Sequence, residues 1–572
     1  MRCALLVLGL LLAGPVADAR GQSMAPYCGT LLDEPEFREA YRRFLQARKS
    51  GSPSVARKTA APPDVGDQQT FLVYIYANNN WVQKLFQLQD KTDIYHAWVE
   101  VANLAQMTQQ ELDTIRSSLL SETPSGSVNP ARGVMQNNHD VFGSAPNVDG
   151  DGIVDFLFYD IDNQNVGGYV HPGDLEADSG GNGRDILHLD IFQSVSFMPR
   201  LIAHEYTHLI HLNYEFDVET FISEGLAEFG MVVNGYTQDN FSYLGFPTEH
   251  KRNLFSWRGV DDGNGGRDYD RGRLFFSYLS ERIGPHSTGA MLRNDRKGAP
   301  GIDSLLVKDG LSLGEVILDF HTANWVFDTG VAAKFGYDRS FSAPLAPIPD
   351  RAIDTIQQSA TSESSPENSP NLEGGAVNYI YFSELADLTL NFDAYAAPAT
   401  VAELPGIKDD IRTRLRGRLV ARRDDGLIIT REVPPAPGNF KLEGNYSEVT
   451  LVVTSINPAK TARYGLAGSW RAFGAATGLA DAPLPTAFRL DSVYPNPLSG
   501  SATVRLQMQQ AGPGTVYLVD ALGRRAAVVH DGYLFAGTHN LRLEAGALLP
   551  GAYLLVAESG SGRSSLSITV VR

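Results

Sequence analysis

Residues 203–211 read Ala-His-Glu-Tyr-Thr-His-Leu-Ile-His, and the interpretation of the whole chain starts from this stretch. His204 and His208 are four residues apart, so on a helix they lie one turn apart on the same face, where their imidazoles can share one zinc ion. Glu205 lies beside that face and can act as a general base toward a water molecule. Apolar residues at helical spacing predict that one side of this helix is buried: Leu201, Ile202, Leu209 and Ile210.

The residues around the motif indicate where its helix begins. Pro199 is tolerated only in a first helical turn, and Ser196 upstream of it is a candidate N-cap. His211 lies on the same face as His204 but about 10 Å further along the axis, too far to share a metal ion on a straight helix. We therefore expect His211 to be a buried histidine beside the site and not a ligand.

A second helix is predicted at residues 221–230, which read Phe-Ile-Ser-Glu-Gly-Leu-Ala-Glu-Phe-Gly. Glu224 and Glu228 are one turn apart on it and therefore share a face. Acidic groups on the buried side of a helix cost stability unless a cation compensates them. A zinc ion facing Glu224 would provide that compensation, and Glu228 could accept the N–H of a zinc-bound histidine and fix its tautomer.

Taken together, these motifs resemble a known family. His-Glu-X-X-His followed by Glu-Gly-X-Ala-Glu is similar to the gluzincin zinc metallopeptidases, and residues 168–169 and 185–189 make the chain most similar to their hyicolysin-like branch. The resemblance covers roughly residues 140–330. It implies that His204, His208 and Glu224 bind zinc and that Glu205 is the general base. It also implies that Glu228 lies behind the ligands.

The resemblance also implies a fold, an α+β zincin-like catalytic domain with a mixed-sheet lobe and a helical lobe. Residues 184–191 read as a strand, and in gluzincins an edge strand in this position pairs with the extended substrate. His188 on it is expected to be a strand side chain and not a ligand. A Tyr or His of the helical lobe stabilises the oxyanion that forms on the substrate. Tyr269, Tyr278 and His286 are the candidates, and we favour Tyr269.

A second candidate metal site lies at residues 147–155, which read Asn-Val-Asp-Gly-Asp-Gly-Ile-Val-Asp. Oxygen-bearing side chains at alternate positions, with Gly in the sixth place, match the start of a calcium-binding loop, although Phe158 stands where a bidentate Glu is expected. The alternative is an Asp/Gly-rich turn that leads into a strand at residues 153–159. The candidate calcium ligands are Asn147, Asp149, Asp151 and Asp155.

The overall composition limits the classes of protein to which the chain can belong. The chain has 572 residues and a net charge of −18, which argues against nucleic acid or an anionic membrane surface as a partner. Residues 1–19 are typical of a secretory signal, with Arg2, an apolar run and the small-residue site at residues 17–19. No other stretch approaches the length of a transmembrane helix.

Cys28 is the second of the two cysteines, and the first, Cys3, lies in the predicted signal. No intramolecular disulfide is therefore expected. Two interpretations of Cys28 stay open: an incidental thiol, or a thiolate that occupies the open position of the zinc in a latent precursor. Residues 20–68 are charged and then rich in Pro, Ala and Ser, and we expect them to be a removable pro-segment and linker.

Two further domains are predicted after the catalytic domain, which we place at residues 69–340. A linker at residues 341–372 leads into short strands at residues 373–470, which are typical of a small all-β sandwich. A second linker at residues 471–486 leads into another small all-β sandwich domain at residues 487–572.

The last domain carries two recognisable motifs, Tyr-Pro-Asn-Pro at residues 494–497 and Gly-Ala-Tyr-Leu-Leu at residues 551–555. With them it resembles the C-terminal sorting domain of type IX secretion cargo. This implies recognition by an outer-membrane secretion machinery, followed by release or attachment at the cell surface. The alternative is a carbohydrate-binding or plain β-sandwich domain.

The sequence as a whole predicts a secreted zinc endopeptidase that acts on protein or peptide substrates. Two alternatives stay open: a zinc-containing surface adhesin or binding protein that has lost catalysis, and a metallohydrolase of a non-peptide amide. The intact Glu205 argues against the first alternative, because a structural zinc site needs no general base.

Overall fold

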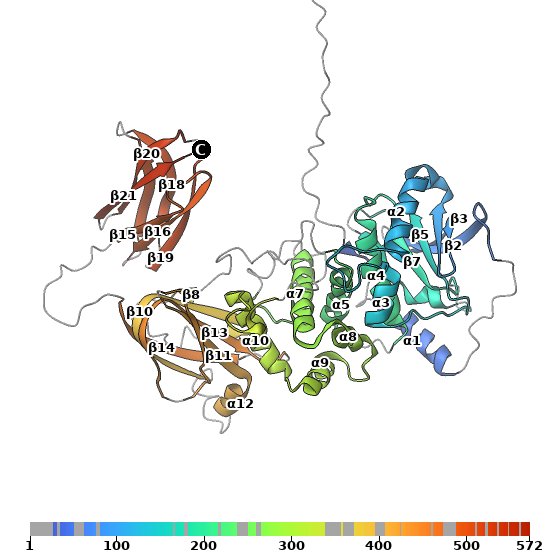
Figure 1. The fold of residues 1–572 in the computed structure, drawn as a ribbon, viewed down its shortest axis with the longest axis horizontal. Coiled ribbons are helices and arrows are strands. Elements are labelled where there is room, and N and C mark those ends of the chain that lie inside the picture. The colour runs from blue at the N-terminus through green and yellow to red at the C-terminus, as the bar shows by residue number, and fades with distance from the viewer. Residues whose placement is uncertain are drawn as a thin grey trace, which may run out of the picture. The chain divides into compact units, whose positions relative to one another are not determined.

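Figure 1 shows the fold of the chain in a computed structural model. The chain divides into two compact units; the first contains residues 1–354, 372–377 and 454–461, and the second contains the others. The predicted signal and most of the two predicted linkers lie outside the described residues. The structure describes residues 27–30, 35–50, 62–75, 80–163, 166–176, 181–214, 219–236, 250–258, 265–337, 356–357, 371–394, 407–423, 425–436, 438–458, 462–472, 488–508, 512–520, 524–534, 537–546, 548–559 and 562–571.

The first unit contains a seven-stranded mixed sheet in the order β1-β6-β7-β5-β4-β3-β2. In it, β4, β5 and β7 run parallel, and every residue of these three strands is buried. This is the pattern of parallel strands that are covered on both faces. The strands are β1 (Tyr27–Cys28), β2 (Gln68–Ile75), β3 (Asn80–Lys91), β4 (Tyr95–Glu100), β5 (Val154–Tyr159), β6 (Val166–Tyr169) and β7 (Ile186–Asp190).

The prediction that residues 184–191 form an edge strand is wrong. The strand itself exists as β7, but it lies between β5 and β6. We missed β6 because it has only four residues, two of them glycine, and shows no alternation of apolar and polar side chains. Beyond β6 the sheet ends with β1, so the N-terminal segment supplies this edge.

The two helices that the sequence predicts around the motifs are present as α4 and α5. Around the sheet, α2 begins with a capping box between Thr108 and Glu111. The motif helix α4 has no capping side chain, so the predicted cap at Ser196 is wrong: Pro199 is the second helical residue and lacks the N–H that a cap would bind. The helices are α1 (Pro35–Lys49), α2 (Gln109–Leu120), α3 (Val134–Phe142), α4 (Met198–Leu212), α5 (Thr220–Val233), α7 (Gly265–Ile283), α8 (Pro285–Gly289), α9 (Gly298–Leu306) and α10 (Leu313–Val326).

Helix α4 packs on one side against β6 and β7 and on the other against α5 (Figure 1). Gly230 of α5 allows the close approach, because a Cβ there would lie 2.3 Å from Oγ1 of Thr207 on α4. From α3, the Asn138 side-chain amide donates to the carbonyl of Ala203 at 2.8 Å and to Thr207 Oγ1 at 3.0 Å. These contacts fix the rotation of α4 about its axis and therefore the direction of its histidines.

Helices α5 and α7 also pack closely, through two glycines. A Cβ on Gly225 would lie 2.4 Å from the ring of Phe276, and a Cβ on Gly272 would lie 3.0 Å from the Cα of Gly225. Larger residues at either position would separate the helices. The contact therefore determines how near the side chains of α7 come to those of α5.

The C-terminal part of the chain is all-β apart from α12 (Ile407–Arg414) in the residues that the structure describes. Seven strands form one sheet in the order β12-β11-β13-β10-β14-β9, with β8 paired to β10. They are β8 (Ile356–Gln357), β9 (Asn371–Leu372), β10 (Val377–Ala394), β11 (Leu415–Arg422), β12 (Ile428–Glu432), β13 (Phe440–Ser455) and β14 (Ala462–Ala472).

The last domain has two sheets, β15-β16-β19 and β18-β17-β20-β21. Residues of both sheets form one hydrophobic core that includes Leu498, Val504, Leu518 and Leu555, so the predicted two-sheet domain is confirmed. Its strands are β15 (Phe488–Tyr494), β16 (Ser501–Met508), β17 (Gly512–Val519), β18 (Arg525–Leu534), β19 (Gly537–Glu544), β20 (Gly551–Ser559) and β21 (Gly562–Val570). Among the described residues, no helix has the length and apolar character needed to cross a membrane.

The glycine contact between α5 and α7 gives a first prediction. Gly225→Ala should lower the free energy of unfolding by about 1–3 kcal/mol, because the added methyl group overlaps the Phe276 ring. Thermal and urea unfolding would measure the change. The exposed Thr114→Ala on α2 is the control, with an expected change within about 0.5 kcal/mol. Equal stability of the two variants would contradict the close packing.

His321 on α10 gives a second prediction, about pH. Its Nε2 lies 2.8 Å from the Gly375 carbonyl oxygen, and burial lowers the pKa of this imidazole from 6.5 to about 3. Below pH 6.5 the unfolded chain therefore takes up a proton that the folded chain does not. Stability should fall as the pH drops from 6.5 toward 3, by up to about 1.4 kcal/mol per pH unit from this residue.

His321→Gln keeps an N–H donor for Gly375 but does not titrate. Urea unfolding at pH 7 and pH 5 should therefore show a smaller loss of stability on acidification in this variant than in the wild type. The same substitution at the exposed His139 on α3 is the control and should keep the wild-type pH dependence. Identical pH dependence of all three proteins would show that His321 is not responsible.

Candidate metal centre

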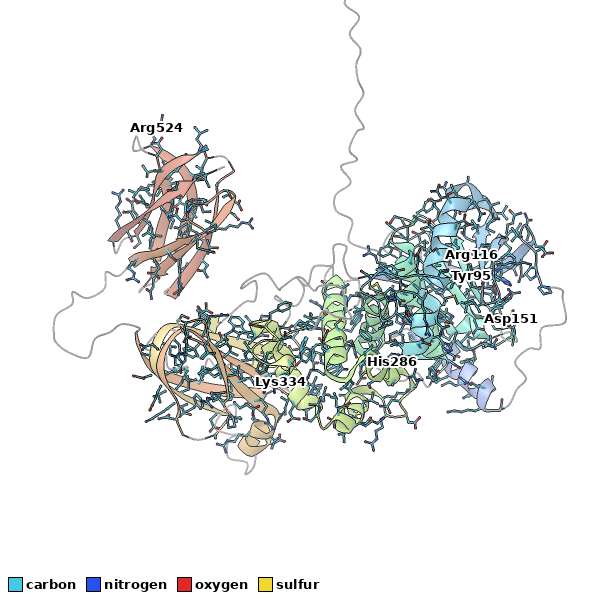
Figure 2. All side chains as sticks on the ribbon, viewed as in Figure 1. Tyr95, Arg116, Asp151, His286, Lys334 and Arg524 are labelled. Atoms are coloured by element: carbon cyan, nitrogen blue, oxygen red, sulfur yellow. The ribbon has the colours of Figure 1, made fainter. Side chains whose placement is uncertain are left out.

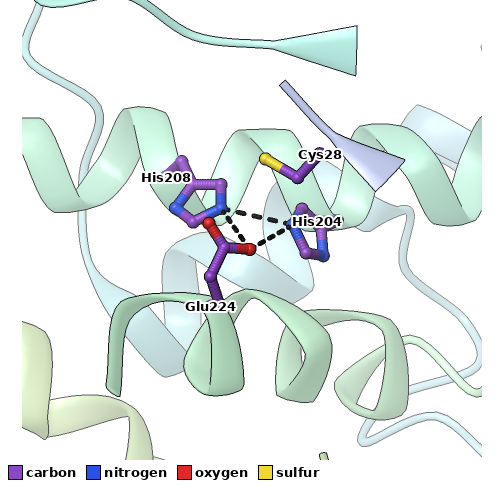
Figure 3. Close-up of side chains that lie close together, drawn as sticks. All are labelled: Cys28, His204, His208 and Glu224. Carbon is purple, nitrogen blue, oxygen red and sulfur yellow. Dashed lines mark hydrogen bonds and ion pairs between the residues drawn. The ribbon is translucent and has the colours of Figure 1, made fainter. Parts of the chain in front are cut away.

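Three side chains from α4 and α5 converge on one point (Figure 3). The Nε2 atoms of His204 and His208 are 3.2 Å apart, and Glu224 Oε2 lies 3.3 Å from the first and 3.5 Å from the second. Among the described residues, the only group of three or more His, Cys, Asp or Glu whose ligand atoms lie within 4.8 Å of one another consists of these three and Cys28. The structure therefore brings the predicted zinc ligands together.

The separations of these atoms fit a tetrahedral metal ion. Two ligand atoms at about 2.1 Å from such an ion lie about 3.4 Å from each other. The three measured separations are close to this value, and the atoms come from two imidazoles and one carboxylate, which are ordinary zinc ligands. Glu224 Oε2 is buried and takes part in no hydrogen bond of good geometry. A zinc ion would satisfy this oxygen and both nitrogen atoms at once.

Further side chains contact the Nδ1 atoms of both histidines, on the side of each ring away from Nε2. Nδ1 of His204 lies 3.2 Å from Glu228 Oε1, and Arg273 of α7 lies 3.3 Å from the other oxygen of Glu228. Nδ1 of His208 lies 3.4 Å from the hydroxyl oxygen of Ser223. With Nδ1 occupied in this way, Nε2 of each imidazole is directed at the metal position. Glu228 thus lies where the sequence predicts it.

Glu205 is fully buried beside the three ligands. Burial raises the pKa of its carboxyl group, while His204 and His208 act in the opposite direction. Glu224 differs: burial alone would raise its pKa, but the two histidines outweigh that effect and lower the pKa to about 2. The site therefore combines a carboxylate that stays ionised, as a ligand must, with one whose proton affinity is increased, as a general base requires.

The structure distinguishes among the three candidates for oxyanion stabilisation. The Tyr269 ring on α7 lies 6.1 Å from the His204 ring, and burial raises the pKa of Tyr269 well above its ordinary value, so its hydroxyl keeps a proton to donate. Tyr278 instead donates to the carbonyl of Lys334 at 2.8 Å. His286 is exposed on α8 (Figure 2). Tyr269 is therefore the candidate that lies beside the ligands.

Two histidines have the structural roles that the sequence predicts for them. His211 is buried, with Nδ1 at 3.3 Å from the Ser223 hydroxyl oxygen, and burial lowers its pKa well below the ordinary value. His188 on β7 stacks on Tyr169 at 4.1 Å and lies 2.9 Å from Asp174. Neither belongs to the converging group of ligands.

Sequence reasoning missed several residues around the site. Ser223 directly precedes Glu224, but a serine in a helix carries no signal of its own. Arg273 lies on another helix, and only the α5–α7 packing brings it to Glu228. Thr30 donates from its hydroxyl to Glu205 Oε2 at 3.2 Å, across 175 positions of the sequence. No local pattern could have indicated such distant contacts.

Comparison with known proteins identifies the family of the C-terminal domain. Residues 492–571 match the secretion system C-terminal sorting domain family. The predicted sorting domain is confirmed, and the chain is a secreted protein of a kind that is often attached to the cell surface. The same domain indicates the type IX secretion machinery as a partner. This family covers only the C-terminal part of the chain, so it assigns no function to the metal centre.

The remaining comparisons add little. The chain matches none of the curated proteins. Among solved structures it is similar to a GH2 β-galacturonidase from Eisenbergiella tayi bound to glycerol, at 12% identity over 34% of each chain with a TM-score of 0.12. It is also similar to a β-1,2-glucanase from Parabacteroides distasonis, at 8% identity over 36% of this chain and 32% of that chain, with a TM-score of 0.13. The chain thus spans about a third of these structures, and the TM-scores are too low to indicate a common fold.

The candidate calcium loop is held by its own side chains. Asn147 Oδ1 accepts the Gly152 N–H at 2.9 Å, and Asp151 Oδ1 accepts the Ile153 N–H at 2.8 Å. Asp149 Oδ1 accepts the N–H of Asp151 at 3.4 Å. These are the bonds of an Asx-type turn.

Asp155 does not join the loop. Its carboxylate accepts from Trp98 Nε1 and from Arg184, both at 2.7 Å, inside the sheet lobe. Asp185 faces the loop in its place and accepts the N–H groups of Asn147 and Val148 at 2.9 and 3.0 Å. Burial raises the pKa of Asp185 to about 7. A cation in the loop would favour the ionised form of this carboxyl group.

Calcium at this loop stays a prediction with a direct test. If Asn147, Asp149 and Asp151 bind it, calcium at 100 times its Kd should stabilise the fold by about 2.7 kcal/mol. Thermal unfolding with calcium and with a calcium-selective chelator would measure this, while the zinc content stays unchanged. Asp149→Asn should abolish the response, whereas Asp295→Asn at an exposed position should keep it. No thermal shift in the wild type would exclude the site.

Proposed function

We propose that the chain is a secreted zinc-dependent endopeptidase with a gluzincin-like catalytic domain. The observation that supports this most is the convergence of His204, His208 and Glu224 at separations that suit a tetrahedral zinc ion, with Glu205 buried beside them. Three protein ligands leave a fourth position for chemistry, which is the arrangement of catalytic zinc sites. The sorting domain indicates a secreted protein, which supports an activity outside the cell.

Each residue of the site has one task in the proposed reaction. His204, His208 and Glu224 would hold a zinc ion, which would supply a Lewis acid to polarise the substrate carbonyl and lower the pKa of the attacking water. Glu205 takes the proton from that water as the new C–O bond forms. It then delivers the proton to the amide nitrogen as the C–N bond breaks. The peptide bond is thereby hydrolysed to a carboxylate and an amine.

Other side chains prepare the site before the substrate arrives. Glu228 and Arg273 hold His204 in the tautomer that directs Nε2 inward, and Ser223 does the same for His208. Tyr269 carries a protonated hydroxyl beside the ligands and is proposed to donate to the oxyanion that forms on the substrate carbonyl. These groups are rigidly held by buried helices, as efficient electrostatic stabilisation requires.

Glu205→Gln tests the proposed function. In the purified, processed protein this variant should keep its zinc, because Glu205 is not a ligand, and should lose about 10²–10⁴-fold in kcat/KM toward casein or a fluorogenic peptide. A zinc chelator should abolish the wild-type activity. Glu122→Gln removes the same charge at an exposed position after α2 and should leave the activity unchanged.

The same assay separates the proposal from its two alternatives. A zinc-loaded wild type that hydrolyses no protein or peptide would favour a binding protein or a substrate with a non-peptide amide. Peptidase activity that survives in Glu205→Gln would remove Glu205 from its role. Activity that survives full removal of zinc would exclude a zinc-dependent mechanism.

A further inference from the structure

The N-terminal segment runs directly over the metal centre. Strand β1 pairs in parallel with β6, with Cys28 opposite Gly168, and the N–H of Gly29 donates to the Gly168 carbonyl at 2.7 Å. Figure 3 shows Cys28 on this strand, with its side chain turned toward His204, His208 and Glu224. Its sulfur completes the one group of converging ligand atoms within 4.8 Å found among the described residues.

The sulfur atom of Cys28 has a position suited to metal binding. Thiolate sulfur is an ordinary zinc ligand, and four protein ligands close a zinc site that three leave open. The backbone N–H of Thr30 lies 3.3 Å from Sγ and would stabilise negative charge on it. On the opposite side, Glu224 Oε2 is buried without a hydrogen bond of good geometry, and a cation between these groups would satisfy it.

The segment also covers the general base. Cys28 Sγ lies 3.6 Å from Glu205 Oε2, and the Thr30 hydroxyl donates to the same oxygen at 3.2 Å. The Thr30 oxygen in turn accepts the N–H of Val170 at 3.0 Å. A water molecule that is to lose its proton to Oε2 of Glu205 would have to occupy the space that these two side chains fill.

A helix then holds the segment on the catalytic unit. One face of α1 is buried, with Phe37, Ala40, Tyr41 and Phe44. The Tyr41 hydroxyl donates to the carbonyl of Tyr214, just after α4, and Arg48 donates to the carbonyl of Asn213 at 2.6 Å. The strand and the helix together tie residues 27–30 and 35–49 to the edge of the metal centre.

We propose that Cys28 binds the zinc ion as a fourth ligand and that residues 20–61 are an inhibitory segment. This rests on the proposed function, since it concerns the same zinc ion. On binding, the thiol gives its proton to solvent and a Zn–S bond forms, which fills the position needed by the attacking water. The enzyme is then latent until the chain is cut between Ser50 and Pro62 and the segment leaves.

Removal of the segment would also create the substrate site. Strand β1 occupies the outer side of β6, so its departure leaves the β6 backbone without that partner. An extended peptide can then pair with β6 by main-chain hydrogen bonds, with its scissile bond near the zinc. This proposal assigns substrate binding to β6. The sequence indicates the neighbouring strand β7 for that role.

Cobalt substitution of the full chain tests the Cys28 ligand without any assay of activity. Cobalt(II) in place of zinc should show thiolate-to-metal charge-transfer absorption in the near ultraviolet. Cys28→Ala should bind cobalt but lose this absorption, because Cys28 is the only cysteine after Cys3 in the predicted signal. The wild-type thiol should also react with a disulfide reagent much more slowly with zinc present than after chelation.

Peptidase assays on the same proteins test latency. Full-length Cys28→Ala should be at least about tenfold more active than the full-length wild type, because a tethered ligand competes at a high effective concentration. Cleavage at a specific protease site placed within residues 51–61 should activate the wild type and have less effect on Cys28→Ala. Thr30→Val, which removes the hydroxyl contacts to Glu205 and Val170 but keeps the thiol of Cys28, should keep the cobalt–thiolate absorption.

The outcomes separate this inference from the proposed function. Cobalt bound without thiolate absorption, or full activity of the uncut wild type, would overturn the inference and leave the peptidase proposal intact. Thiolate absorption in a protein that stays inactive after the cut would support the ligand and contradict the peptidase. The double variant Cys28→Ala with Glu205→Gln should stay inactive, since opening the site cannot replace the base.

Discussion

The constraint on which the first unit depends is the burial of three carboxylates side by side. Glu205, Glu224 and Glu228 are at most 4% exposed, and each would cost several kcal/mol if its charge were left without compensation. Arg273 neutralises one of them through Glu228. The proposed divalent cation between His204, His208 and Glu224 would compensate the remaining charge. Metal binding is therefore expected to contribute to the stability of the helices as well as to chemistry.

The Nδ1 atoms of the two histidines contact different groups, and this difference affects the basicity of each imidazole. His204 has a carboxylate behind it, itself paired with a guanidinium group, whereas His208 has the Ser223 hydroxyl. A carboxylate partner raises the basicity of an imidazole more than a neutral hydroxyl does. This arrangement would strengthen one ligand of the proposed zinc ion while it limits the negative charge around the ion, which would keep it an effective Lewis acid. The contact of Gly225 with Gly272 serves this arrangement, because it brings α7 and its Arg273 within reach.

The sequence predicted the zinc ligands because their geometry is local. A spacing of four residues on a helix fixes the relation of His204 to His208 and of Glu224 to Glu228, and burial of the apolar face sets the direction. The hydroxyl of Thr30 and the thiol of Cys28 reach the same site through strand pairing between β1 and β6, which no periodicity encodes.

The candidate calcium loop shows where a prediction from local spacing fails. Its residue types match a known spacing, but side chains in a strand alternate between faces, and β5 turns Asp155 toward Trp98 and Arg184. Asp185, which faces the loop, belongs to the segment that leads into β7 and lies far away in the sequence. A spacing pattern that continues into a strand therefore does not determine which side chains meet.

The sorting domain gives the lone cysteine a further significance. A protein that is secreted leaves the reducing cytoplasm, and an unpaired thiol outside the cell is open to oxidation or to disulfide exchange. Cys28 has no second cysteine to pair with once the predicted signal is gone. Coordination by zinc would protect the thiolate from both reactions, while the thiolate would keep the peptidase from attacking other proteins during export. The proposed bond would thus account for the position of an otherwise vulnerable cysteine beside the candidate metal ligands of an extracellular chain.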